Sequence, residues 1–208
     1  MPEIKNITKC KEYRPKVKAM FEAVLELFAS GCDLSTMKVA EITSKAGIGK
    51  GTAYEYFSTK EEIVLGALNY EFKRNMKQMM ALLKSGKNFK EVIYEGMELM
   101  EQGNNRYHGF AIMQKIMEDK GISGKTMLYE IEKHQDACDL MLEFTEEFSR
   151  LALKDDCIKE TEHYKIQTAI ISQCISFAFY LTHRKLYPEV EIQTAKDFAY
   201  ESILKMLN

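Results

Sequence analysis

Residues 39–57 decide the fold, and they read VAEITSKAGIGKGTAYEYF. The first part of this stretch has apolar residues at the spacing of one helical face, namely Val39, Ile42 and Ala46. Gly47 follows at the point where helices commonly end in a left-handed residue. A second short helix is predicted over residues 50–56, with Gly49 as its N-cap. Two short helices joined by a glycine turn form a helix-turn-helix, which places its second helix in the major groove of DNA.

The predicted second helix carries groups suited to the DNA backbone. Lys50 and Gly51 lie at its start, where helix amides bear partial positive charge and Gly51 has no side chain to block a phosphate. Tyr54 and Tyr56 add phenolic donors that can reach sugar–phosphate oxygens. Thr52 lies where the side chain of a major-groove helix reaches base edges.

A third helix is predicted to begin directly after this pair. Ser58-x-x-Glu61 and Thr59-x-x-Glu62 are two overlapping capping boxes, each of which marks a helix start. An uninterrupted apolar run, residues 63–65, follows them.

This segment resembles the DNA-binding domain of the tetracycline-repressor (TetR) family of bacterial transcriptional regulators. The residues that carry the resemblance are Ile42, residues 46–57, Lys60 and Glu61. They span only the N-terminal part of the chain, and the rest resembles the family in length and helicity alone. The resemblance implies an all-α protein of about nine helices. It also implies a DNA-binding domain at residues 1–58 and a helical ligand-binding and dimerisation domain at residues 59–208.

Two positions depart from the family pattern. The family often has Ser at the position of Gly49 and Thr at the position of Lys38, where the threonine caps the first helix of the pair. We therefore expect the cap to move to Ser35 or Thr36, and Lys38 to supply a charge contact instead. The predicted DNA-contact residues are Thr36, Lys38, Lys50, Gly51, Thr52, Tyr54, Tyr56 and Lys60.

Composition narrows the class of protein. The 208 residues carry a net charge of −2, which argues against non-specific coating of DNA. Residues 1–18 nevertheless hold six Lys or Arg against two Asp or Glu. This basic segment is either an arm that binds DNA phosphates or an ordinary solvated tail. Five scattered cysteines and a polar N-terminus indicate a reducing, cytoplasmic location.

Helical periodicity continues to the end of the chain, and no strand pattern interrupts it. Outside the helix-turn-helix, helices are predicted over residues 14–30, 59–84, 88–102, 106–120, 125–153, 161–186 and 191–207. Gly31, Gly86 and the run 103–105 are expected to end the first, second and third of these.

The helix at residues 161–186 is apolar around most of its circumference. Polar residues spread through its uncharged stretch, 166–183, favour a buried helix over a membrane span. A helix that is apolar on all sides must be covered on all sides, so it needs a second partner. The TetR resemblance implies one, because that family dimerises through its last two helices. The predicted interface residues are Ile171, Ile175, Phe179 and Phe198.

Thirteen methionines are many for this length, and several fall on the inner faces of the middle helices. They form either a plain core or an adaptable cavity for an apolar or aromatic ligand. His134 is likewise either a core histidine or a polar anchor in that cavity. The predicted ligand-binding residues are Met97, Met100, Phe110, Met113, Met117, Tyr129, His134, Gln173 and Phe177.

No pattern indicates an enzyme, a cofactor or a metal. Residues 121–126 resemble half a phosphate loop, but Asp119 replaces the first glycine and no strand precedes them. Residues 160–163 give one Glu-x-x-His, whereas a di-iron bundle needs two.

The sequence therefore predicts a ligand-responsive repressor that binds a palindromic operator as a homodimer. The alternative is a ligand-independent architectural or nucleoid-associated DNA-binding protein. A helical enzyme with a vestigial helix-turn-helix is disfavoured, because Lys50 and Lys60 preserve the basic character of the motif.

Overall fold

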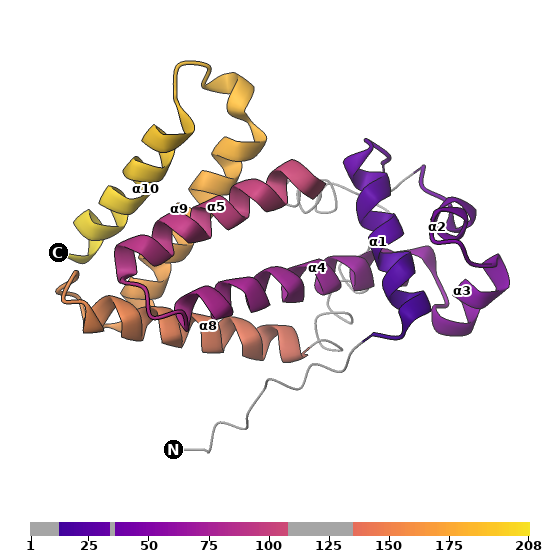
Figure 1. Cartoon of the computed structure of the whole chain (residues 1–208), viewed down its shortest axis with the longest axis horizontal. Helices are drawn as coiled ribbons and strands as arrows, with labels where there is room; N and C mark the ends of the chain where they lie inside the picture. The colour runs from indigo at the N-terminus through magenta and orange to yellow at the C-terminus, as the bar shows by residue number, and fades with distance from the viewer. Residues whose placement is uncertain (1–12, 34–35, 108–134) are drawn as a thin grey trace. The chain divides into compact units, whose positions relative to one another are not determined.

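The computed structural model describes residues 13–33, 36–107 and 135–208 (Figure 1). Within these ranges the chain is helical and contains no strand, so the all-α prediction is confirmed. The helices are α1 (Pro15–Ala29), α2 (Val39–Lys45), α3 (Lys50–Tyr56), α4 (Lys60–Leu83), α5 (Phe89–Tyr107), α8 (Gln135–Lys154), α9 (His163–Thr182) and α10 (Ile192–Leu207), with a short 3-10 helix η1 (Arg184–Leu186). The helix predicted at 106–120 and the first part of that at 125–153 lie almost wholly outside the described residues.

The described residues group into two compact units. The first contains residues 13–33, 36–75 and 135–140, and the second contains residues 76–107 and 141–208. The division falls inside α4 and α8. The functional boundary between residues 58 and 59 stays a prediction.

The first unit is built around α1. Pro15 opens this helix at a position where its missing N–H costs nothing, and Gly31 follows its end with a φ of +89°. The inner face of α1 is buried, α1 packs on α2, and α2 packs on α3. The fully buried side chains of this small core include Met20, Val24, Leu25, Ile42 and Ala53.

The turn between α2 and α3 has the geometry that the sequence predicts. Gly47 adopts a φ of +67°, which is strained for any residue with a Cβ. Its amide donates to the Ser44 carbonyl at 3.2 Å, and the Ile48 amide donates to the Thr43 carbonyl at 3.0 Å. These two bonds are the Schellman pair, so they satisfy carbonyls that the end of α2 leaves unpaired.

The second unit contains α5, α9, α10 and most of α8. Figure 1 shows α10 running back alongside α9, and these two helices form the most extensive contact between elements. α5 packs against both of them. The buried core includes Phe89, Val92, Phe148, Ile166, Ile170 and Ile203.

Two helix ends differ from the prediction. α5 continues through Gly103 to Tyr107, because Gly103 keeps an ordinary helical backbone rather than the positive φ that ends a helix. α9 stops at Thr182, and the chain then makes the 3-10 turn η1. The Tyr180 hydroxyl donates to the Val190 carbonyl at 2.8 Å, which ties the last turn of α9 to the segment before α10.

Candidate nucleic-acid interface

α3 is a short helix that uses little of its surface for packing. It begins after Gly49, whose extended backbone (φ −72°, ψ 145°) is that of an N-cap, and it buries only Ala53 completely. Lys50, Gly51 and Tyr54 are exposed. Thr52 and Tyr56 are half-buried. The predicted contact residues of α3 are therefore on its outer side or at its margin.

Cations lie over both tyrosine rings of α3. Lys50 Nζ is 6.0 Å from the ring centroid of Tyr54, and Arg14 Cζ is 5.9 Å from the ring centroid of Tyr56. Both distances are within the range of a cation–π interaction. The Lys50–Tyr54 pair follows from helical i, i+4 spacing, but no sequence signal places Arg14 beside Tyr56, and the sequence prediction missed Arg14.

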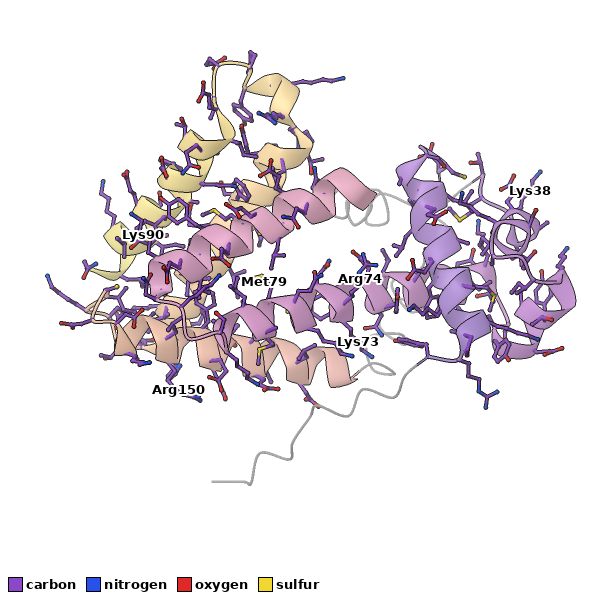
Figure 2. The ribbon with its side chains drawn as sticks, in the orientation of Figure 1. Lys38, Lys73, Arg74, Met79, Lys90 and Arg150 are labelled. Atoms are coloured by element: carbon purple, nitrogen blue, oxygen red, sulfur yellow. The ribbon has the colours of Figure 1, made fainter. Side chains whose placement is uncertain are left out.

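The start of α2 corrects the predicted cap. The Thr36 hydroxyl donates to the Asp33 carbonyl at 3.0 Å and does not cap α2, while Ser35 lies outside the described residues. Lys38 occupies the N-cap position, and a lysine side chain has no acceptor. Instead, the Glu41 carboxylate accepts a hydrogen bond from the Lys38 backbone N–H at 2.9 Å. The Lys38 side chain is exposed and projects away from α2 (Figure 2).

The start of α4 confirms one of the two capping boxes in part. The Thr59 hydroxyl accepts a hydrogen bond from the Glu62 backbone N–H at 3.1 Å. The Glu62 carboxylate reaches one residue further back than expected, to the Ser58 backbone N–H at 2.7 Å. Lys60, the first residue of α4, has a side chain only 22% exposed, with Nζ 4.0 Å from Glu61.

The cations of this unit differ in how far carboxylates neutralise them. Lys45 Nζ is 3.1 Å from the Glu26 carboxylate. Within the described ranges, no carboxylate forms an ion pair with Arg14, Lys38 or Lys50. These three residues therefore carry positive charge that remains available to a partner.

The structure describes only four of the predicted ligand-binding residues, and all four lie in the second unit. Met97 and Phe177 are buried, and Met100 is half-buried. Gln173 Oε1 is buried without a hydrogen-bond partner among the described residues, and so is Asn104 Oδ1. Sequence reasoning missed Asn104, because it placed the end of α5 there. The other predicted ligand residues, Phe110, Met113, Met117, Tyr129 and His134, lie outside the described ranges.

α4 and α5 approach closely within this unit. A Cβ at Gly96 of α5 would lie 2.9 Å from Cε of Met79, the α4 side chain labelled in Figure 2. The glycine therefore makes room for the methionine, whose flexible end can still adjust.

Three of the four residues predicted for a dimer interface are exposed in the single chain. Ile175 and Phe179 on α9 are 54% and 41% exposed, and Phe198 on α10 is 65% exposed. Ile171 is half-buried. The Phe179 ring stacks on His183 with centroids 4.2 Å apart. Two adjacent helices thus present large apolar side chains to solvent, which is unusual for a monomer.

Other candidate sites have structural explanations. The Glu160 carboxylate accepts from the backbone N–H groups of Glu162 and Thr161 and pairs with Lys165 at 2.9 Å. The Glu162 N–H and the Lys165 ammonium together hold the pKa of Glu160 below its usual value. No cluster of potential metal ligands occurs in the part of the chain that the structure describes. The residues of the phosphate-loop resemblance, 121–126, lie outside it.

Two further observations concern a cysteine and the lengths of the helices. Burial raises the pKa of Cys174 to about 11, which further disfavours the thiolate form at neutral pH. Across the described helices, none is long and apolar enough to cross a membrane.

Comparison with known proteins agrees with this architecture. Residues 22–67 match the sequence model of the bacterial regulatory proteins of the tetR family. No curated protein matches the chain. The fatty acid degradation regulator FadR of Bacillus halodurans is similar in structure, with a TM-score of 0.66 at 14% identity over 93% of this chain and 97% of that one.

Two further solved structures are similar over nearly the same length. The transcriptional regulator FadR of Bacillus subtilis, solved with stearoyl-CoA, gives a TM-score of 0.64 at 15% identity, over 92% of this chain and 97% of that one. A TetR family transcription regulator of Marinobacter aquaeolei VT8 gives 0.60 at 17% identity, over 93% and 95%. Residues 22–67 thus carry the sequence pattern of the tetR family of bacterial regulatory proteins. Nearly the whole chain has the fold of a TetR-family transcriptional regulator.

Proposed function

We propose that the protein is a ligand-responsive transcriptional repressor that binds a palindromic operator as a homodimer in the cytoplasm. The observation that carries this proposal is the exposed apolar surface of α9 and α10, in a chain whose N-terminal unit contains a helix-turn-helix that matches the tetR family. Because a two-fold dimer presents two identical readers, it matches an inverted-repeat site on DNA.

The surface of α9 and α10 supports a homodimer. Ile175, Phe179 and Phe198 are 54%, 41% and 65% exposed, so covering the rest of each with a second copy would contribute about 0.6–2 kcal/mol per residue. α9 is apolar around most of its circumference, so it needs a partner on the side that its own chain leaves exposed. A second copy of the chain would bury that side.

The second unit supports an apolar or aromatic ligand. Met97 and Phe177 offer soft apolar walls, and the buried, unpartnered Oε1 of Gln173 offers a polar anchor. The Bacillus subtilis relative was solved with stearoyl-CoA, so long-chain acyl thioesters are candidate ligands for this chain as well. α4 contributes residues to both units, and ligand binding is proposed to shift this helix and change the distance between the two readers of a dimer.

Two other functions compete with this proposal. An architectural DNA-binding protein would need neither a ligand nor a preferred sequence. An enzyme would need a reactive constellation, and the clustered acids at the start of α9 are already paired with Lys165. We therefore propose a non-enzymatic role.

A two-part measurement tests the ligand-responsive function. Thermal shift identifies ligands in a panel of free fatty acids, acyl-CoA thioesters, phenols and small multiply charged compounds. Each hit is then added to the protein bound to DNA. We expect an apolar or aromatic hit that stabilises the protein and releases DNA. Stabilisation only by small multiply charged compounds contradicts the apolar site, and the absence of any hit supports the architectural alternative.

A further inference from the structure

The contact between Arg14 and Tyr56 joins two separate elements. Arg14 is the N-cap residue of α1, whereas Tyr56 is the last residue of α3. Arg14 Cζ lies 5.9 Å from the tyrosine ring centroid. The pair therefore places a cation from the start of α1 at the C-terminal turn of α3.

The backbone on both sides of Arg14 is held in place. The Tyr13 ring packs edge-on against Phe21 and Tyr70, with centroid distances of 5.2 Å and 5.7 Å. On the other side of Arg14, the ring of Pro15 fixes its own φ at the first turn of α1. Arg14 therefore projects from an ordered backbone, so only its side-chain torsions remain to be fixed when it lies over Tyr56.

Arg14 also keeps its charge and its donors available. Its side chain is exposed, and no ion pair with a carboxylate involves it in the described part of the chain. The contact with the Tyr56 ring uses none of the guanidinium N–H groups in a hydrogen bond, so they remain available as donors. Their fork geometry matches the paired oxygens of a phosphate.

We propose that Arg14 contacts a DNA phosphate and that the Tyr56 ring positions it for this contact. The proposal rests on the proposed DNA-binding function and deepens it. Tyr56 then acts through Arg14, in addition to any contact that its own hydroxyl makes. A cation at this point extends the contact surface of α3 to the start of α1.

The test is the salt dependence of binding to a random-sequence duplex, measured with the full chain. Each phosphate neutralised by a cation contributes about 0.9 to the slope of log affinity against log salt concentration. We expect Arg14→Ala to lower the slope by about this amount, and Tyr56→Leu to approach the same loss. Tyr56→Phe keeps the ring and should retain the slope, and Arg14→Lys keeps the charge and should restore most of it.

Controls separate this proposal from simpler explanations. Lys90 lies over Tyr94 and Tyr200 at 5.6 Å and 5.5 Å in the second unit, so Lys90→Ala removes a similar cation–π lysine and should leave the slope unchanged. Circular dichroism checks the fold of each variant. Arg14→Ala is the decisive variant, because Arg14 is exposed and its replacement should leave the fold intact.

A wild-type slope in Arg14→Ala overturns the proposal. Losses from Arg14→Ala and Tyr56→Leu that add fully in the double variant overturn the positioning role, because coupled residues are not additive. A wild-type protein that binds no duplex contradicts the proposed DNA-binding function itself, and the Arg14 contact with it.

Discussion

In the first unit, neighbouring carboxylates decide which lysines are available to bind a polyanion such as DNA. Lys50 is exposed and unpaired by any carboxylate within the described ranges, whereas Lys45 is held by Glu26 at 3.1 Å. Lys60 is partly covered and lies near Glu61. Charge in the sequence alone does not distinguish these three residues, but their surroundings do.

Lys50→Ala should weaken binding to all DNA sequences, because a phosphate contact carries no sequence information. The slope of log affinity against log salt should fall by about 0.9. Lys45→Ala is the matched control, since this lysine is already paired with Glu26 and should change the slope less. Equal slopes for the two variants would show that Lys50 does not contact the backbone.

At the scale of elements, glycines inside helices differ in how closely neighbouring side chains approach them. A Cβ at Gly66 of α4 would lie 2.7 Å from two carbons of the Phe21 ring, which is itself packed against Phe57 and Tyr70. A Cβ at Gly103 of α5 would meet nothing within 4 Å. The two glycines look alike in the sequence, and only the packed structure separates them.

Gly66→Ala should therefore destabilise the protein, because overpacking of a rigid core costs about 1–3 kcal/mol and outweighs the better helix propensity of alanine. Gly103→Ala should stabilise it by roughly 0.5–1 kcal/mol, since only the propensity changes. Urea unfolding of both variants measures the free energies. A Gly66→Ala variant as stable as Gly103→Ala would mean that Phe21 moves aside freely.

Two tyrosines that join helices make stability sensitive to alkaline pH. The Tyr70 hydroxyl donates to Glu22 at 2.7 Å between α4 and α1, and the Tyr94 hydroxyl donates to Asp197 at 2.7 Å between α5 and α10. Burial, followed by the hydrogen-bonded carboxylate, raises the pKa of each tyrosine from 10.0 to about 12. The phenol form is therefore favoured by folding.

The direction of the pH effect follows from these raised values. The stabilisation is fully present below the unfolded pKa of about 10 and is lost as the pH rises through the folded pKa of about 12, because unfolding releases protons in that range. Tyr70→Phe and Tyr94→Phe should each make the alkaline loss shallower. Urea midpoints at about pH 8 and about pH 11 test this. An unchanged loss in both variants would contradict the assignment.

At the scale of the whole molecule, local signals predicted the fold well and long-range contacts poorly. The turn at Gly47 and the cap at Thr59 depend on residues within one turn, and the structure has both. The Arg14–Tyr56 contact and the burial of Asn104 Oδ1 depend on packing between distant segments, so no spacing rule indicates them. The candidate ligand site is predicted only in outline for the same reason, because its residues come from several helices.

The exposed surface of α9 and α10 leads to a prediction about assembly. Phe179→Glu and Phe198→Glu should give folded monomers, because both side chains are exposed in the single chain but would bury an unpaired carboxylate in a dimer. Leu142→Glu, at an exposed leucine of α8, is the matched control and should leave the assembly unchanged. Sedimentation equilibrium measures the mass. If both phenylalanine variants remain folded dimers, the interface lies elsewhere.

The central claim is that two copies of this chain read DNA together. Selection of bound duplexes from a random-sequence pool tests it most directly, because the recovered sequences report both specificity and symmetry. The account predicts an inverted repeat whose half-sites are separated by about 10–10.5 base pairs, centre to centre, or a multiple of that spacing. A recovered pool with no preferred sequence, bound with an affinity that only the salt concentration sets, would contradict it.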